Sequence, residues 1–163
     1  MSPSRRADLL LSGVALGGVA AVGAALVSQH VFDMQPCPWC VLQRLVFLLV
    51  SAAALVGLVW RSAMGQRLSG GLVTLLALCG VSAALWQHFV AKSSASCNLT
   101  LAERWIAASG LDAALPAVFA AYASCADAAV DLAGLPYEYW SLALFAAIAG
   151  AGAVVAAQSA RAD

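Results

Sequence analysis

The sequence has very few charged residues: only 10% of its 163 residues are Asp, Glu, Lys or Arg, and 63% are hydrophobic. Its mean hydropathy is +0.90. Soluble domains are about 45–50% apolar and about 25% charged, so this composition indicates a membrane protein. The eight basic and eight acidic residues leave no net charge. The composition therefore gives no reason to expect a nucleic-acid partner.

Charges are missing altogether from four long segments: residues 9–32, 45–60, 68–91 and 139–160. Crossing a hydrocarbon core of ~30 Å takes about 20 helical residues. Three segments are long enough, and the second is too if its helix begins near Cys40 and includes Arg44. We therefore predict an all-α membrane protein, a four-helix transmembrane bundle that forms one membrane domain over residues 1–163. The predicted spans cover about 9–29, 41–60, 69–90 and 139–159.

The basic residues predict the orientation of this bundle, because they favour the cytoplasmic side of a membrane. Both termini and the connection between the second and third spans are predicted to be cytoplasmic on the basis of Arg5, Arg6, Arg61, Arg67 and Arg161. The outer loops, about 30–40 and 91–138, hold six of the eight acidic residues. Four tryptophans fall at predicted span ends, where their amphipathic rings prefer to lie: Trp39, Trp60, Trp86 and Trp140.

The N-terminal apolar run has a competing interpretation as a cleaved signal peptide. The run over 9–28 exceeds the ~7–15 residues of a usual signal core, and Asp8 lies at its start. We therefore predict a membrane span. Small residues recur on one face of it, which predicts close packing on a neighbouring helix: Gly13, Gly17, Ala20 and Ala24.

The long outer loop has helical patterns of its own. Thr100 and Glu103 form a capping-box pattern, which predicts a helix over about 101–109. We expect this short helix to lie flat on the outer leaflet. A second segment has the spacing of a helix face but leaves open whether it lies on the membrane or packs on the first: Leu115, Val118, Phe119 and Tyr122.

Four of the five cysteines belong to the outer loops, as the pairs Cys37 with Cys40 and Cys97 with Cys125. Cys79 lies within the third span, where a lone cysteine is usually a small inert apolar residue. Loop cysteines in an oxidising compartment often form structural disulfides. A disulfide within Cys-x-x-Cys, however, closes almost no chain and adds little stability. That spacing is more typical of redox-active pairs.

The first pair is placed where a helix is expected to begin, and the positive end of a helix dipole stabilises a thiolate. Arg44 lies four residues after Cys40, on the same helical face and at membrane depth. A charge there is costly and suggests a function. Its guanidinium could stabilise the Cys40 thiolate or hydrogen-bond a polar ligand. The alternative is that Arg44 extends to the membrane surface.

Two metal sites are possible alternatives to this redox interpretation. A four-cysteine zinc site is disfavoured because its common pattern repeats Cys-x-x-Cys, whereas Cys97 and Cys125 are 28 positions apart. His30 and His88 both fall at outer span ends and could ligate a haem, although interfacial histidines are commoner. No metal is predicted.

The chain resembles the disulfide bond formation protein B (DsbB) family of bacterial inner-membrane thiol oxidases. The resemblance covers essentially the whole chain. The residues and stretches that carry it are Gln29-His30-Val31, Pro36-Cys37-Pro38-Trp39-Cys40, Arg44, Gln87-His88, Ala95-Ser96-Cys97, Cys125, Gly134-Leu135-Pro136 and Trp140. Proteins similar to vitamin K epoxide reductase use like parts, but their Cys-x-x-Cys follows the loop cysteines.

The resemblance implies an electron route. A periplasmic DsbA-like thioredoxin-fold protein would attack a Cys97–Cys125 disulfide at Cys97, and Cys125 would pass electrons to Cys37 and Cys40. Cys40 would then reduce a bound quinone, either ubiquinone or menaquinone, with Arg44 polarising it. Each transfer between cysteines is thiol–disulfide exchange.

The same resemblance assigns His88 to the quinone region and places the cysteine loops in the periplasm. The chain departs from the best-known member at Gln43, where an acidic residue precedes the arginine. Three alternatives stay open at this point: an enzyme like vitamin K epoxide reductase, a non-enzymatic membrane protein with two structural disulfides, and a haem carrier.

Overall fold

The computed structural model describes residues 3–91 and 101–159. Its four long helices are α1 Pro3–Val31, α2 Pro38–Val59, α3 Ala63–Trp86 and α7 Tyr137–Ser159. Each contains a stretch long and apolar enough to cross a membrane. The predicted four-helix membrane bundle is therefore confirmed, and the chain is a multi-pass membrane protein. Where a bilayer begins and ends along each helix, and the division into one domain, stay predictions.

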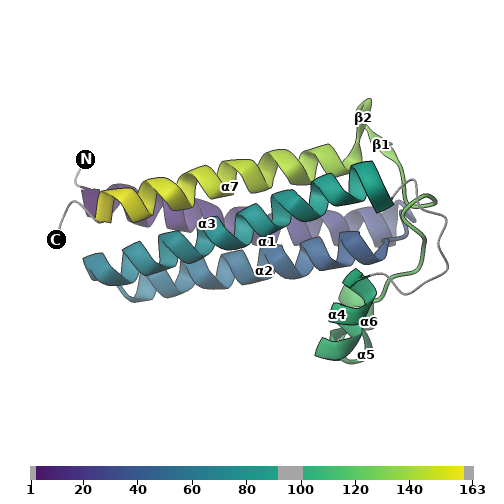
Figure 1. Cartoon of the computed structure of the whole chain (residues 1–163), viewed down its shortest axis with the longest axis horizontal. Coiled ribbons are helices and arrows are strands. Elements are labelled where there is room, and N and C mark those ends of the chain that lie inside the picture. The colour runs from purple at the N-terminus through teal and green to yellow at the C-terminus, as the bar shows by residue number, and fades with distance from the viewer. Residues whose placement is uncertain (1–2, 92–100, 160–163) are drawn as a thin grey trace.

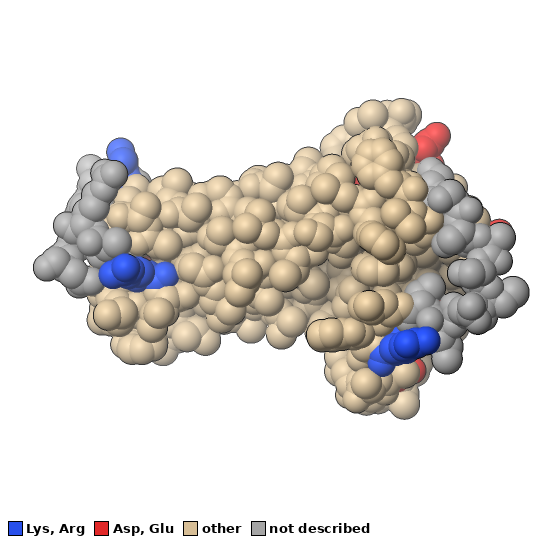
Figure 2. Space-filling view, in the orientation of Figure 1, with Lys and Arg blue, Asp and Glu red and all other residues tan. Residues whose placement is uncertain are grey.

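The four helices form a ring in which α1 packs on α2, α2 on α3, α3 on α7 and α7 on α1. Both ends of the chain and the connection from α2 to α3 lie at one end of the bundle, and the outer-loop elements lie at the other (Figure 1). On the face that Figure 2 shows, basic side chains lie at the first end and on the outer-loop helices, and the surface between the two ends carries no charge. This distribution is the one that the charge-free segments predict.

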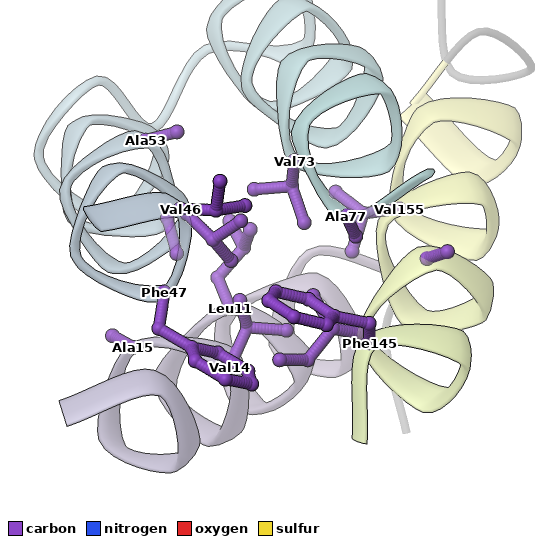
Figure 3. Close-up of a cluster of buried hydrophobic side chains, with 14 of the residues drawn as sticks. Leu11, Val14, Ala15, Val46, Phe47, Ala53, Val73, Ala77, Phe145 and Val155 are labelled. Carbon is purple, nitrogen blue, oxygen red and sulfur yellow. The ribbon is translucent and has the colours of Figure 1, made fainter. Parts of the chain in front are cut away.

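Small and medium apolar side chains fill the centre of the bundle around one aromatic pair (Figure 3). The rings of Phe47 on α2 and Phe145 on α7 stack with centroids 3.9 Å apart and planes 6° from parallel. Such a pair contributes about 0.5–1.5 kcal/mol beyond the area that it buries. Lipid tails are as apolar as these residues, so close packing between helices is what favours the bundle over separated helices.

Glycines allow the closest helix contacts, but not the glycines that the sequence pattern indicated. A Cβ on Gly18 would meet the side chain of Ser51 and the backbone of Phe47, whereas nothing lies within 4 Å of one on Gly13 or Gly17. The prediction of tight packing at Gly13 and Gly17 is therefore wrong. The close approach of α1 to α2 occurs at Gly18, one position farther along the chain than the predicted stripe.

The described part of the outer loop contains three short helices and a hairpin: α4 Leu101–Ser109, α5 Leu111–Ala114, α6 Pro116–Phe119, β1 Asp131–Leu132 and β2 Leu135–Pro136. The helix predicted over 101–109 is confirmed, although its capping residue Thr100 lies outside the described residues. The second predicted segment begins helical turns only at Pro116, because proline favours the first position of a helix. The antiparallel hairpin turns through Gly134, whose φ of +80° suits glycine.

Helix α4 has two apolar sides. Ala102 and Ile106 are buried, and Ile106 packs with Val41 of α2. Leu101 and Trp105 are 59% and 67% exposed on the other side. An apolar exposed side is what a helix at the membrane surface requires, and the flat orientation of α4 on the outer leaflet stays a prediction.

Candidate redox site and acceptor cavity

The Cys-x-x-Cys pair lies at the beginning of α2. Cys37 is the N-cap residue in an extended conformation (φ −86°, ψ 165°), and Pro38 begins the helix. The Cys37 sulfur accepts a hydrogen bond from the backbone N–H of Cys40 at 3.3 Å, and the two Sγ atoms are 2.7 Å apart. The pair is therefore close enough to form a disulfide. The N-terminal end of α2 also favours negative charge on its sulfur atoms.

Cys125 comes from the outer loop to the beginning of α2, although 84 residues separate it from Cys40 in the sequence. It is buried and packs with Cys37 and Ala91. Hydrogen bonds with Cys125 and Cys40, together with burial, raise the pKa of the Cys37 thiol. The hydrogen bond from Cys37 lowers the pKa of Cys125. Cys37 therefore keeps its proton while Cys125 favours the thiolate.

Three of the four predicted redox cysteines thus lie together, with no disulfide formed among the described cysteines. Cys97 lies outside the described residues, so its predicted role as the entry point stays a prediction. Cys79 is on the exposed side of α3 and away from this group. Its position agrees with an apolar residue that faces lipid.

Gln87 donates a hydrogen bond to the sulfur of Cys40, and Gln43 donates one to Gln87. Gln87 donates from Nε2 to the Cys40 Sγ at 3.4 Å, and Gln43 donates from Nε2 to the Gln87 Oε1 at 2.7 Å. Both glutamines are buried. Gln87 is the first residue of a π-helix, η1 Gln87–Ala91, that extends α3. An amide N–H directed at sulfur stabilises its thiolate, so this arrangement can assist Cys40 as a nucleophile or leaving group.

Arg44 is buried, with only 5% of its surface exposed. Its guanidinium donates to Gln29 Oε1 at 2.7 Å and to the backbone oxygen of Val118 at 2.9 Å. A third, longer contact of 3.4 Å reaches the backbone oxygen of Ala25. Arg44 therefore joins α1, α2 and the end of α6, and it does not extend into water as the alternative interpretation required.

A cavity of about 400 Å³ opens beside Cys40 and Arg44. Ligand pockets measure about 300–1,000 Å³, are mostly apolar and carry a few polar groups. This cavity fits that description, since residues of α1, α2, α7 and the hairpin form apolar walls around a few polar side chains. The polar and ionisable side chains among its lining residues are Ser28, Gln35, Cys40, Gln43, Arg44, Gln87, Tyr137, Glu138 and Ser141.

The two histidines occupy different surroundings. His88 lies outside the cavity lining, and its Nδ1 is 2.8 Å from Oε1 of Glu138, which does line the cavity. Its Nε2 is 3.1 Å from the hydroxyl of Tyr139. His30 is exposed and its Nε2 lies 3.3 Å from the backbone oxygen of Ala117. His88 therefore reaches the cavity only through Glu138, and its assignment as a direct ligand contact stays a prediction.

The sequence patterns assign no role in this site to four polar residues that the structure places in it: Gln29, Gln43, Gln87 and Glu138. Gln87 and Gln29 directly precede His88 and His30. An uncharged polar residue at the end of an apolar span is the signal that points to each of them. Glu138 directly precedes the charge-free segment 139–160, so the sequence alone places it in the outer loop.

Comparisons with known proteins identify the family of the chain. The family described as "Disulfide bond formation protein DsbB" matches residues 6–155. A protein of Azoarcus sp. (strain BH72), named "Disulfide bond formation protein B", is 34% identical over 90% of this chain and 90% of its own length. Proteins of the same name from Nitrosospira multiformis and Herminiimonas arsenicoxydans are 30% and 32% identical, covering 91% and 86% of this chain and 90% and 89% of their own lengths. No solved structure matches the chain significantly.

Proposed function

The chain belongs to the disulfide bond formation protein B family and is a protein-disulfide oxidoreductase, and from this premise we propose that it oxidises a periplasmic DsbA-like dithiol protein and passes the electrons to membrane quinone. Its work in the cell would be to maintain disulfide formation in exported proteins. One observation carries the proposal: Cys37, Cys40 and Cys125 pack together, and Cys40 lines an apolar cavity.

The first transfer is a thiol–disulfide exchange in the outer loop. A thiolate of the partner attacks Cys97 of a Cys97–Cys125 disulfide, forming a mixed disulfide and releasing the Cys125 thiolate. The partner's second thiol then breaks the mixed disulfide, so the partner leaves oxidised and Cys97 leaves reduced. The packing of Cys125 against Cys37 supports this step, because it releases the Cys125 thiolate beside the next disulfide.

The second transfer passes through the contact between the outer loop and α2. The Cys125 thiolate attacks Cys37 of a Cys37–Cys40 disulfide, and Cys40 leaves as a thiolate. The burial of Cys125 against Cys37 supports this order. The Gln87 amide and the start of α2 stabilise the departing Cys40 thiolate. Attack of Cys97 on the Cys37–Cys125 bond then restores the loop disulfide and leaves Cys37 and Cys40 reduced.

The cavity beside Cys40 has the properties that a quinone requires. Its walls are apolar, Cys40 lies in its lining, and Arg44 and Gln43 offer hydrogen-bond donors. A quinone bound there would supply a two-electron acceptor. Arg44 would hold a ring oxygen, Gln87 would keep Cys40 oriented, and the apolar walls would exclude water from the site.

The orientation in the cell belongs to the same proposal. The end of the bundle with the termini would face the cytoplasm, because it carries the basic residues. The three cysteines would then face the periplasm of a bacterium with an inner membrane, where the partner would introduce disulfides into exported proteins.

Trapping the mixed disulfide tests the order of transfer. When the second cysteine of the partner is replaced by serine, no thiol of the partner can break the mixed disulfide, so Cys97 should stay joined to the partner. Non-reducing gels should show a heavier species that dithiothreitol removes. Cys97→Ser should give no such species, whereas the matched control Cys79→Ser should give as much of it as the wild type, since Cys79 faces outward from α3. An adduct that requires Cys37 would show that the proposed order is wrong.

A further inference from the structure

Glu138 is the one acidic side chain among the described residues that line the cavity. Its side chain is only 5% exposed, although it belongs to the first turn of α7. A carboxyl group in such an apolar place is costly, and its retention there suggests a function. It lies in the cavity wall together with Cys40 and Arg44.

His88 connects this carboxyl group to the outside of the protein. The His88 Nδ1 lies 2.8 Å from Glu138 Oε1, and the His88 side chain is 22% exposed. Its other nitrogen, Nε2, lies 3.1 Å from the hydroxyl of Tyr139, which is 36% exposed. The three groups form a continuous hydrogen-bonded path from the cavity to the surface.

The two nitrogens of an imidazole allow this path to carry protons. When Glu138 is ionised, the Nδ1 of His88 must donate to it, which leaves Nε2 free to accept a proton from the surface side. Uptake at Nε2 and release from Nδ1 deliver one proton to the carboxylate and return the ring to its neutral form.

We propose that Glu138 and His88 form a proton path into the acceptor cavity, an inference that rests on the proposed function. Reduction of a quinone by Cys37 and Cys40 forms one disulfide and releases two electrons and two protons. The acceptor takes up both electrons and two protons, so the reaction balances. In the proposed path Glu138 gives a proton on the cavity side and regains one through His88, twice for each quinone reduced. The two protons lost by the thiols return to the surrounding water.

The other titratable groups around Glu138 leave this role to it. Cys40 and Arg44 line the cavity from α2, and Tyr137 lines it from α7. Cys40 is the electron donor, and an arginine stays protonated in proteins. The hydroxyl of Tyr137 lies 3.5 Å from Ser28 Oγ of α1, whereas the carboxyl group of Glu138 is the one in contact with His88.

Glu138→Gln tests the path, because it keeps the size of the side chain and removes the titrating group. In quinone-dependent turnover we expect kcat to fall at least about a hundredfold, the usual contribution of an acid–base group. The dependence of kcat on pH should flatten, while KM for quinone changes little. Asp131→Asn is the matched control, since Asp131 is an exposed carboxylate on β1, and it should leave both unchanged. His88→Phe should lower kcat without changing single-turnover oxidation of the partner.

Infrared titration of the protein without quinone gives a second measurement. Lowering the pH should produce a carboxylic acid C=O band that Glu138→Gln abolishes and Asp131→Asn retains. The proposal is overturned if no titrating band depends on Glu138, or if Glu138→Gln keeps the wild-type kcat and pH profile. A wild-type protein without quinone-dependent turnover would contradict the proposed function instead, and the infrared titration would still decide whether Glu138 exchanges protons.

Discussion

Replacing Arg44 by alanine should weaken the binding of quinone and loosen the bundle at the same time. The buried guanidinium donates to Gln29 Oε1 at 2.7 Å and to the Val118 oxygen at 2.9 Å. The loss of a hydrogen bond from a charged donor costs about 1.5–3 kcal/mol. If the same guanidinium also holds a quinone oxygen, the affinity for quinone should fall roughly ten- to a hundredfold.

Steady-state kinetics against quinone concentration measure this effect as a rise in KM. Oxidation of the partner in a single turnover by pre-oxidised enzyme should be nearly unchanged, because that step uses only the cysteines. Arg44→Lys should recover part of the affinity, since an ammonium keeps the charge but not the planar fork. Thermal unfolding of the detergent-solubilised protein measures the structural part of the loss.

Gln29→Leu separates binding from positioning. It removes one acceptor of Arg44 and leaves the guanidinium in place. A thermal stability that falls as in Arg44→Ala, with a KM near the wild-type value, would assign the change in KM to the guanidinium itself. An unchanged KM in Arg44→Ala would refute the reasoning: Arg44 would then only join helices, and the quinone would bind elsewhere.

Three further changes test other parts of the account. Gln87→Leu removes the amide donor that stabilises the Cys40 thiolate. In the reduced variant, alkylation of Cys40 should therefore need a higher pH than in the wild type to reach the same rate. Cys37→Ala removes the hydrogen bond that lowers the pKa of Cys125, so alkylation of Cys125 should slow at neutral pH and shift to higher pH, and Cys37→Ser should shift it less. Gly80→Val would drive a side chain into the aromatic ring that packs on this position, and such overpacking should cost about 1–3 kcal/mol of unfolding free energy.

The helices could be predicted from the sequence because membrane spans exclude charge. Even the short charge-free segment 45–60 predicts a span correctly when Arg44 is included in its helix. The structure gives the reason: backbone and amide oxygens from two other elements satisfy the guanidinium. The predicted contacts of Gly13 and Gly17 failed, because a stripe of small residues does not say which side of a helix meets a neighbour.

The site was predictable in its cysteines and not in its polar surroundings. The Cys-x-x-Cys spacing is local, so it indicates the redox pair without any knowledge of the tertiary fold. No periodic pattern around Cys125 places it against Cys37, because the loop between residues 120 and 130 forms neither a helix nor a strand. Glu138 and Gln87 enter the cavity through long-range contacts between η1 and α7, and only tertiary structure reveals such contacts.

Quinone-dependent oxidation of a reduced DsbA-like protein tests the central claim most directly. Purified protein in lipid vesicles should consume one quinone for each disulfide formed in the partner. Cys40→Ser should abolish that stoichiometric turnover, because Cys40 is the cysteine that lines the cavity. Oxidation of the partner that continues in Cys40→Ser, or that proceeds equally without quinone, would contradict the account.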